Sequence, residues 1–283
     1  MRASRPSRTA PDLVPAIRDG DLWMGKHSDG ESSGATRPVV TSMPAMTPAR
    51  ADEIAVRIPL PPFSIQGTLT LPEQPRGIVL LAQGSGASRL GRRDRLILEV
   101  LAEARLGTAV LDLITPEEGE VDENTHLLWS DVHFLAGRLV IATDWLAQRA
   151  KTRHLSFGHL GAGAGASIAL VAASARSSVV QAIVSRGGRP DLVPPALACV
   201  TAPTLFIVAG KATKELSANR RAMESLAAMD KKLRIVRRAT RPSGTRAALD
   251  EMAQLARDWF VRFLDPAGHR LESPANGDVR TQS

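Results

Sequence analysis

The fold of this chain is decided by residues 155–170, LSFGHLGAGAGASIAL. The segment begins as an apolar run typical of a buried strand, breaks into alternating glycine and alanine, and continues with helical spacing. Strand, glycine turn and helix in this order lift the residue at the centre of the turn above the carboxyl edge of a sheet. That central residue is Gly163, which has no side chain.

The spacing of Gly161, Gly163 and Gly165 is that of a nucleophile elbow, the G-x-S-x-G turn. The frame of the elbow is kept, and the serine is absent. The segment also satisfies G-x-G-x-x-A through Ala166, a dinucleotide fingerprint. That alternative is disfavoured, because no acidic residue follows about 20 positions later to bind a ribose, although Arg186 could bind a 2′-phosphate.

Length and composition predict a folded chain with one large α/β domain or two small ones. The 283 residues are 43% hydrophobic and 23% charged. The net charge of +7 is spread along the chain, and aromatic residues make up only 4%, which argues against a nucleic-acid binder. No apolar run approaches the roughly 18 to 20 residues of a membrane span, and the N-terminus does not resemble a secretory signal.

The single cysteine, Cys199, excludes an internal disulfide framework and a zinc site built from several cysteines. It is compatible with a reducing compartment, so we expect a cytoplasmic protein. We also expect Cys199 to be an inert buried thiol.

Alternation and apolar runs predict strands and helices in alternation. Residues 54–60 and 65–71 alternate like an antiparallel edge pair, and continuous apolar runs predict central parallel strands. These runs are residues 77–82, 108–113, 155–160, 179–184 and 204–209, with a short strand at 233–236. Helices are predicted at 96–104, 127–150, 165–170 and beyond, 216–229 and 247–263, and the acidic residues 117–123 as a solvated loop.

Three regions are predicted along the chain: a disordered N-terminal extension over 1–50, a folded domain over 51–265, and a flexible tail over 266–283. The extension mixes Arg, Ser, Pro and Gly. It could carry a docking motif around Trp23, or be translated leader if Met43 or Met46 is the true start.

In this order the elements resemble the α/β-hydrolase fold, and over about residues 54–263 the chain is similar to the dienelactone-hydrolase-like family. The segments that carry the resemblance are GSGASR at 84–89, LDLITPEE at 111–118, the elbow, VSRGGRPDL at 184–192 and APTLFIVAG at 202–210. The resemblance implies an α/β fold with a mostly parallel central sheet and helices on both faces. It also implies a triad of nucleophile, acid and histidine.

Each triad position is substituted in this chain. Gly163 stands for the nucleophile, Ala212 for the acid and Arg241 for the histidine, and the loop that often begins His-Gly begins Gln83-Gly84. Glycine cannot attack carbon, alanine cannot orient a base, and arginine stays protonated and cannot accept a proton. The chain is therefore predicted to be a catalytically degenerate pseudo-hydrolase.

Backbone donors and a nearby cation would still attract an anion at the former active site. The predicted ligand-binding residues are Gln83, Gly84, Ser85, Gly86, Gly163, Ala164 and Arg241. We expect a small anionic or apolar ligand or a protein partner in this cleft, with no cofactor, no metal, no nucleic acid and no membrane.

Other side chains could in principle restore catalysis. His159 is expected to be a satisfied core residue, with His154 at the start of the same strand, and Ser167 is expected to face packing or the next strand. His126 and His133 could share a helix face, but two histidines make a poor metal site. Two alternatives stay open: an active ester hydrolase or lyase that uses non-standard residues, and a nucleotide-binding module.

Overall fold

The computed structural model describes residues 51–83, 91–122, 125, 127–237 and 245–264. The chain divides into two units, Met1–Met46 and Thr47–Ser283, and all described residues belong to the second. The predictions for residues 1–50 and 266–283 lie outside the described residues and stay predictions.

One eight-stranded sheet has the order β1-β2-β4-β3-β5-β6-β7-β8. Its strands are β1 (Ala51–Leu60), β2 (Phe63–Pro72), β3 (Gly77–Gln83), β4 (Leu106–Asp112), β5 (Ser156–Ala162), β6 (Val180–Arg186), β7 (Thr204–Ala209) and β8 (Lys231–Val236). The pairs β1–β2 and β2–β4 are antiparallel, and the pairs from β4 to β8 are parallel. The predicted fold class and antiparallel pair are therefore confirmed.

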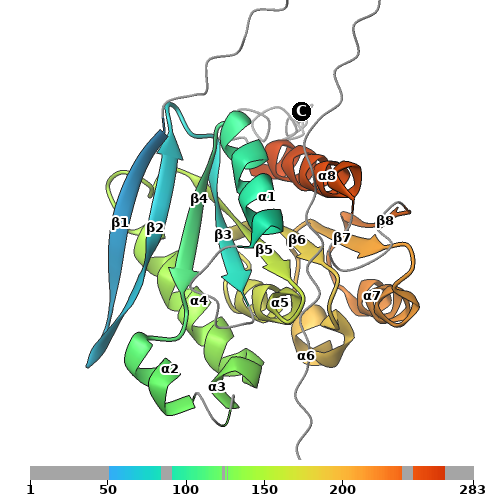
Figure 1. Cartoon of the computed structure of the whole chain (residues 1–283), viewed down its shortest axis with the longest axis horizontal. Coiled ribbons are helices and arrows are strands. Elements are labelled where there is room, and N and C mark those ends of the chain that lie inside the picture. Colours follow the sequence, from blue (N-terminus) through green and yellow to red (C-terminus); the bar gives the residue numbers. More distant parts are fainter. Residues whose placement is uncertain (1–50, 84–90, 123–124, 126, 238–244, 265–283) are drawn as a thin grey trace, which may run out of the picture. The chain divides into compact units, whose positions relative to one another are not determined.

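Helices cover both faces of the sheet (Figure 1). They are α1 (Arg92–Glu103), α2 (Pro116–Asp122), α3 (Leu127–Ser130), α4 (Val132–Ala147), α5 (Gly165–Ala175), α6 (Pro194–Leu197), α7 (Thr213–Ser225) and α8 (Arg246–Leu264), with a 3₁₀ turn η1 at Pro190–Leu192. One apolar cluster joins the sheet to α1 and α8, and the other joins it to α4, α5, α6 and α7. Because α5 packs on the sheet and also contacts α4 and α6, most of its residues are buried.

Two predictions between β4 and β5 were wrong. The acidic stretch forms α2, in which Glu118 pairs with the buried Arg138 and the buried Asp122 accepts hydrogen bonds from the first amides of α3, including Leu127 N–H at 2.8 Å. The predicted helix over 127–150 is divided at Asp131, whose carboxylate accepts the Phe134 N–H at 2.9 Å and caps α4. The acidic composition suggested solvated side chains, whereas Asp122 and Asp131 bind backbone N–H groups nearby in the chain and Glu118 pairs with Arg138 of α4.

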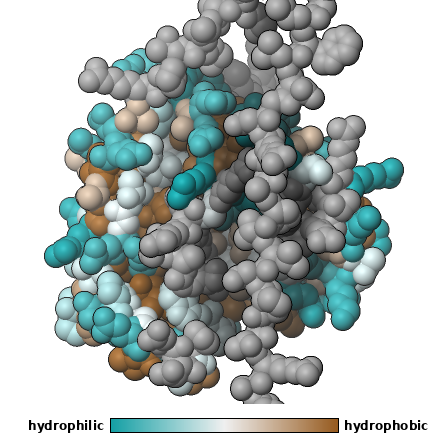
Figure 2. Space-filling view, in the orientation of Figure 1, coloured by the Kyte–Doolittle hydropathy of each residue, from teal (hydrophilic) through white to brown (hydrophobic). Residues whose placement is uncertain are grey.

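Exposed apolar side chains gather near α2 and α3. Figure 2 shows hydrophobic surface at the lower edge of the view, where Figure 1 places these two helices. Val121 and Leu127 are exposed there. In the described part of the chain, no helix is long and apolar enough to cross a membrane.

Candidate functional site

The elbow is a tight turn between β5 and α5. Gly163 has φ +58°, a left-handed backbone conformation that residues other than glycine rarely adopt. Its N–H donates to the Arg186 carbonyl at 3.0 Å, and its own carbonyl accepts the Ala166 N–H at 3.2 Å. The end of β6 and the first turn of α5 thus hold the turn from two sides.

Neighbouring glycines permit this close approach. A Cβ at Gly161 would lie 2.3 Å from the Gly165 carbonyl oxygen, and one at Gly188 would lie 2.0 Å from the Gly163 oxygen. A Cβ at Gly163 would meet nothing within 4 Å among the described residues. Positions 161 and 188 therefore require glycine for space, while position 163 favours it only through φ.

The structure brings some of the predicted site residues to one edge of the sheet. Gly163 and Ala164 are exposed at the end of β5, and Ala212 precedes α7 just after β7. The backbone of Gln83 ends β3, opposite Ala162. The side chain of Gln83 and the predicted site residues Gly84, Ser85, Gly86 and Arg241 lie outside what the structure describes.

Arg186 ends β6, and its carbonyl accepts the Gly163 N–H. Its side chain forms an ion pair with Asp94 of α1 and is only 12% exposed. Burial lowers the pKa of Arg186, the charge of Asp94 raises it and the charge of Arg93 lowers it. Its Nε is buried and has no hydrogen-bond acceptor among the described residues. The Arg186 guanidinium thus has Asp94 as its ion-pair partner, and the positive charge of Arg93 opposes it.

The contribution of Arg93 and Asp94 was missed at the level of sequence. Asp94 and Arg186 are 92 positions apart in the chain, and no sequence pattern predicts that two residues so far apart will be in contact. Only the packing of α1 on the sheet shows this contact. Arg186 itself was singled out, but for a dinucleotide phosphate.

His159 lies inside the core rather than in the cleft. Its Nε2 is 3.0 Å from the Thr143 hydroxyl and its Nδ1 is 3.3 Å from the Ala169 carbonyl oxygen. Burial lowers the pKa of His159 to about 4, and the Ala169 contact opposes this shift. The prediction of a satisfied core histidine is confirmed.

The other candidate side chains are also accounted for. Ser167 is buried and donates its hydroxyl proton to the Arg189 carbonyl at 3.2 Å, as its predicted packing role requires. Cys199 is exposed, so the prediction of a buried thiol was wrong. It follows α6, where Leu197 and Val200 are buried while Ala198 and Cys199 face the solvent. His154 and His133 are exposed, and His126 lies outside the described residues.

No group of three or more His, Cys, Asp or Glu that could hold a metal occurs among the described side chains.

Comparison with known proteins fixes the family. A solved structure of a dienelactone hydrolase from Anabaena variabilis is 45% identical, with TM-score 0.72, over 76% of this chain and 99% of that one. The chain belongs to the dienelactone hydrolase family. The structure of the esterase Est1E from Butyrivibrio proteoclasticus with ferulic acid bound is 11% identical, with TM-score 0.62, over 74% of this chain and 99% of that one, and it shares the fold. No family model matches the chain.

Two curated relatives of this dienelactone hydrolase family member come from Mycobacterium tuberculosis, strains H37Rv and CDC 1551. Each is 40% identical over 258 residues, which are 91% of this chain, and each is named "putative phosphoribosyl transferase". The chain spans about half of their length, 54%. Their name therefore describes proteins with a large additional part.

Proposed function

We propose that this member of the dienelactone hydrolase family does not hydrolyse esters and instead binds a small anionic ligand at its elbow. The observation that carries the proposal concerns Gly163. This residue has the left-handed backbone conformation of the elbow and open space where a Cβ would stand, but it carries no side chain. Acyl transfer needs a nucleophile and a base within reach of it. Glycine supplies no nucleophile at this point.

The substitution at Ala212 supports the same conclusion. The acid of a triad orients and stabilises the histidine, and a methyl group cannot do this. Arg241, in the position of the histidine, cannot act as a base because guanidinium remains protonated. Loss of all three groups would leave only the weak rate enhancement that binding and backbone donors give.

An anion is favoured by the charges around the turn. At the start of α5 the Ala166 and Ser167 N–H groups donate to the Gly163 and Ala164 carbonyls, and the exposed Ala164, which precedes the helix, presents its own N–H at the helix N-terminus. Arg186 pairs with Asp94 while the charge of Arg93 acts on it unfavourably, so a further negative charge would offset the repulsion between the two guanidinium groups. A ligand carboxylate or phosphate can approach Gly163 closely because no Cβ lies in the way.

Two measurements test the two halves of the proposal. A fluorophosphonate probe and p-nitrophenyl acetate should give no serine labelling and no hydrolysis above that of a heat-denatured sample. Stoichiometric labelling of any serine would overturn the claim of inactivity. Inorganic phosphate and benzoate should raise the melting temperature through mass action.

The binding half has a matched control. Arg186→Met should reduce the shift in melting temperature, because it removes the charge beside the elbow. Arg257→Met, at an exposed arginine paired with Asp258 on α8, should leave the shift unchanged. If neither anion shifts the melting temperature, or if the two variants behave alike, the elbow is not an anion site.

The name of the M. tuberculosis relatives favours a second candidate, transfer of a phosphoribosyl group by the longer proteins. Incubation of this chain with 5-phosphoribosyl pyrophosphate separates the two candidates. Release of pyrophosphate in the presence of a nucleobase would favour the transferase, and binding without turnover would favour the anion site. A cytoplasmic location and a protein partner remain part of the proposal, supported by the single cysteine and the exposed elbow.

A further inference from the structure

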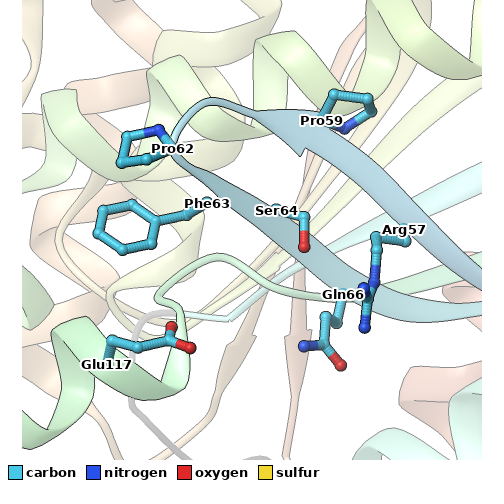
Figure 3. Close-up of a pocket in the computed structure, with 7 residues that line it drawn as sticks. All are labelled: Arg57, Pro59, Pro62, Phe63, Ser64, Gln66 and Glu117. Atoms are coloured by element: carbon cyan, nitrogen blue, oxygen red, sulfur yellow. The ribbon is translucent and has the colours of Figure 1, made fainter.

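A polar groove lies on the hairpin formed by β1 and β2, at the side of the sheet that faces α2 (Figure 3). It has a volume of about 460 Å³. Arg57, Ser64 and Gln66 rise from the two strands, Phe63 lies at the turn, and Glu117 reaches in from α2 (Figure 3). Two prolines of the hairpin complete the lining.

Strand register places the polar side chains on one face. Arg57 lies opposite Gln66, and their neighbours Ile58 and Ile65, which also lie opposite each other, are fully buried. Because side chains alternate between the faces of a strand, Arg57 and Gln66 point away from the core. The alternation of side chains along β1 and β2 thus places apolar residues on the core face of the hairpin and polar residues on its outer face.

These polar groups are not engaged with other parts of the protein. Arg57, Ser64, Gln66 and Glu117 form no hydrogen bond or ion pair through their side chains to any described residue. A guanidinium, an amide and a carboxylate are planar groups that each present two or more polar atoms in one direction. Together they offer both donors and acceptors to a ligand.

Charge restricts what the groove can take. One guanidinium and one carboxylate line it, so an anion would meet Glu117 and a cation would meet Arg57. A wholly apolar ligand would desolvate four polar side chains without binding them. The lining therefore selects a neutral ligand rich in hydroxyl groups.

Phe63 supplies the apolar part of such a site. Its side chain is 41% exposed, although a phenyl ring is usually buried. In Figure 3 the ring lies between Pro62 and Glu117, at the end of the groove away from Arg57. An exposed ring face binds C–H groups of a sugar, while hydroxyl groups both donate and accept hydrogen bonds. We propose that this groove is a carbohydrate-binding site for one or two neutral sugar rings.

The groove is separate from the elbow. Gln66 pairs with Asp112 of β4, and β4 is followed in the sheet by β3 and then by β5, which carries the elbow. Strands lie about 4.8 Å apart, so β2 is about 14 Å from β5. The proposal is therefore independent of the proposed anion site.

Nuclear magnetic resonance titration of the full chain tests the groove. Maltose, cellobiose and sucrose are added to the ¹⁵N-labelled protein, and we expect at least one to shift the amide signals of the β1–β2 hairpin, with a dissociation constant of about 1 mM. Phe63→Ala should weaken this binding about tenfold, and Glu117→Gln, an exposed residue whose loss does not affect the core, should weaken it as well.

Met229→Ala is the matched control, since it removes an exposed apolar side chain next to β8. It should bind as the wild type does. Three results would overturn the proposal: no hairpin shifts with any of the three sugars at about 100 mM, equal binding by wild type, Phe63→Ala and Glu117→Gln, or shifts confined to the elbow. Hairpin shifts caused by trialanine and not by the sugars would also overturn it, in favour of a peptide site.

Discussion

The buried histidine allows a quantitative prediction for stability against pH. His159 is fully buried, and its pKa of about 4 in the folded protein lies below its ordinary value of about 6.5. The unfolded chain therefore takes up a proton at this residue before the folded chain does. At neutral pH both are uncharged and there is no penalty. As the pH falls below about 6.5, the free energy of unfolding decreases.

The expected size follows from the two pKa values. The loss amounts to about 2–3 kcal/mol at pH 4.5 and exceeds about 3 kcal/mol below pH 4. Urea unfolding at pH 7 and at pH 4.5, followed by tryptophan fluorescence, measures it in the wild type and in His159→Gln. Between these two pH values the variant should lose about 2–3 kcal/mol less than the wild type does. Subtracting the change measured for the variant from that of the wild type cancels the contribution of the carboxylates, which titrate in both proteins.

An exposed histidine provides the control. His154→Gln, at the surface before β5, should keep the pH dependence of the wild type. An identical pH dependence in His159→Gln, or an imidazole of His159 that titrates near 6.5 by nuclear magnetic resonance, would refute the assignment of this residue to the core. A base in the cleft would then have to be reconsidered.

Three further outcomes are expected. Gly161→Ala should destabilise the fold by about 3 kcal/mol or more, because its Cβ would lie 2.3 Å from a backbone oxygen. Gly163→Ala should cost only about 1–2 kcal/mol, because the only obstacle there is the positive φ. Denaturant unfolding measures both variants, and equal losses of stability would contradict this geometry. Arg138→Ala should lower the free energy of unfolding by about 3–5 kcal/mol, because the largely buried carboxylate of Glu118 would lose its ion-pair partner. A loss below about 1 kcal/mol in the same measurement would show that the ion pair is solvated. Cys199 should react with Ellman's reagent in the native protein at the rate of the urea-unfolded chain, and protection until unfolding would show that it is covered.

Much of the scaffold could be predicted from sequence. Apolar runs of strand length between helical segments imply a parallel sheet, and alternation implies the β1–β2 pair, because each pattern follows from which faces of an element are buried. The observed boundaries of the elements differ from the predicted ones by a few residues. For example, β8 begins at Lys231 and not at Leu233. The glycine turn was equally clear, because its spacing leaves few other conformations.

The site could be predicted only in part. Gly163 and Ala212 follow from their places after two strands, since parallel strands end at one edge of the sheet. The pairing of Arg186 with Asp94 and the groove at Arg57 and Glu117 could not be predicted, because each joins segments whose distance along the chain carries no periodic signal.

The sequence by itself determined that the chain forms a mostly parallel sheet with a glycine turn, and that no nucleophile stands at the centre of this turn. Both statements concern local residue type and spacing, which the chain carries without folding. Only the tertiary structure decided which groups His159 contacts, that Cys199 is exposed and that Glu118 is paired. The reason is physical: burial and pairing depend on which distant segments pack together, and the same side chain has a different pKa, charge and reactivity in each environment.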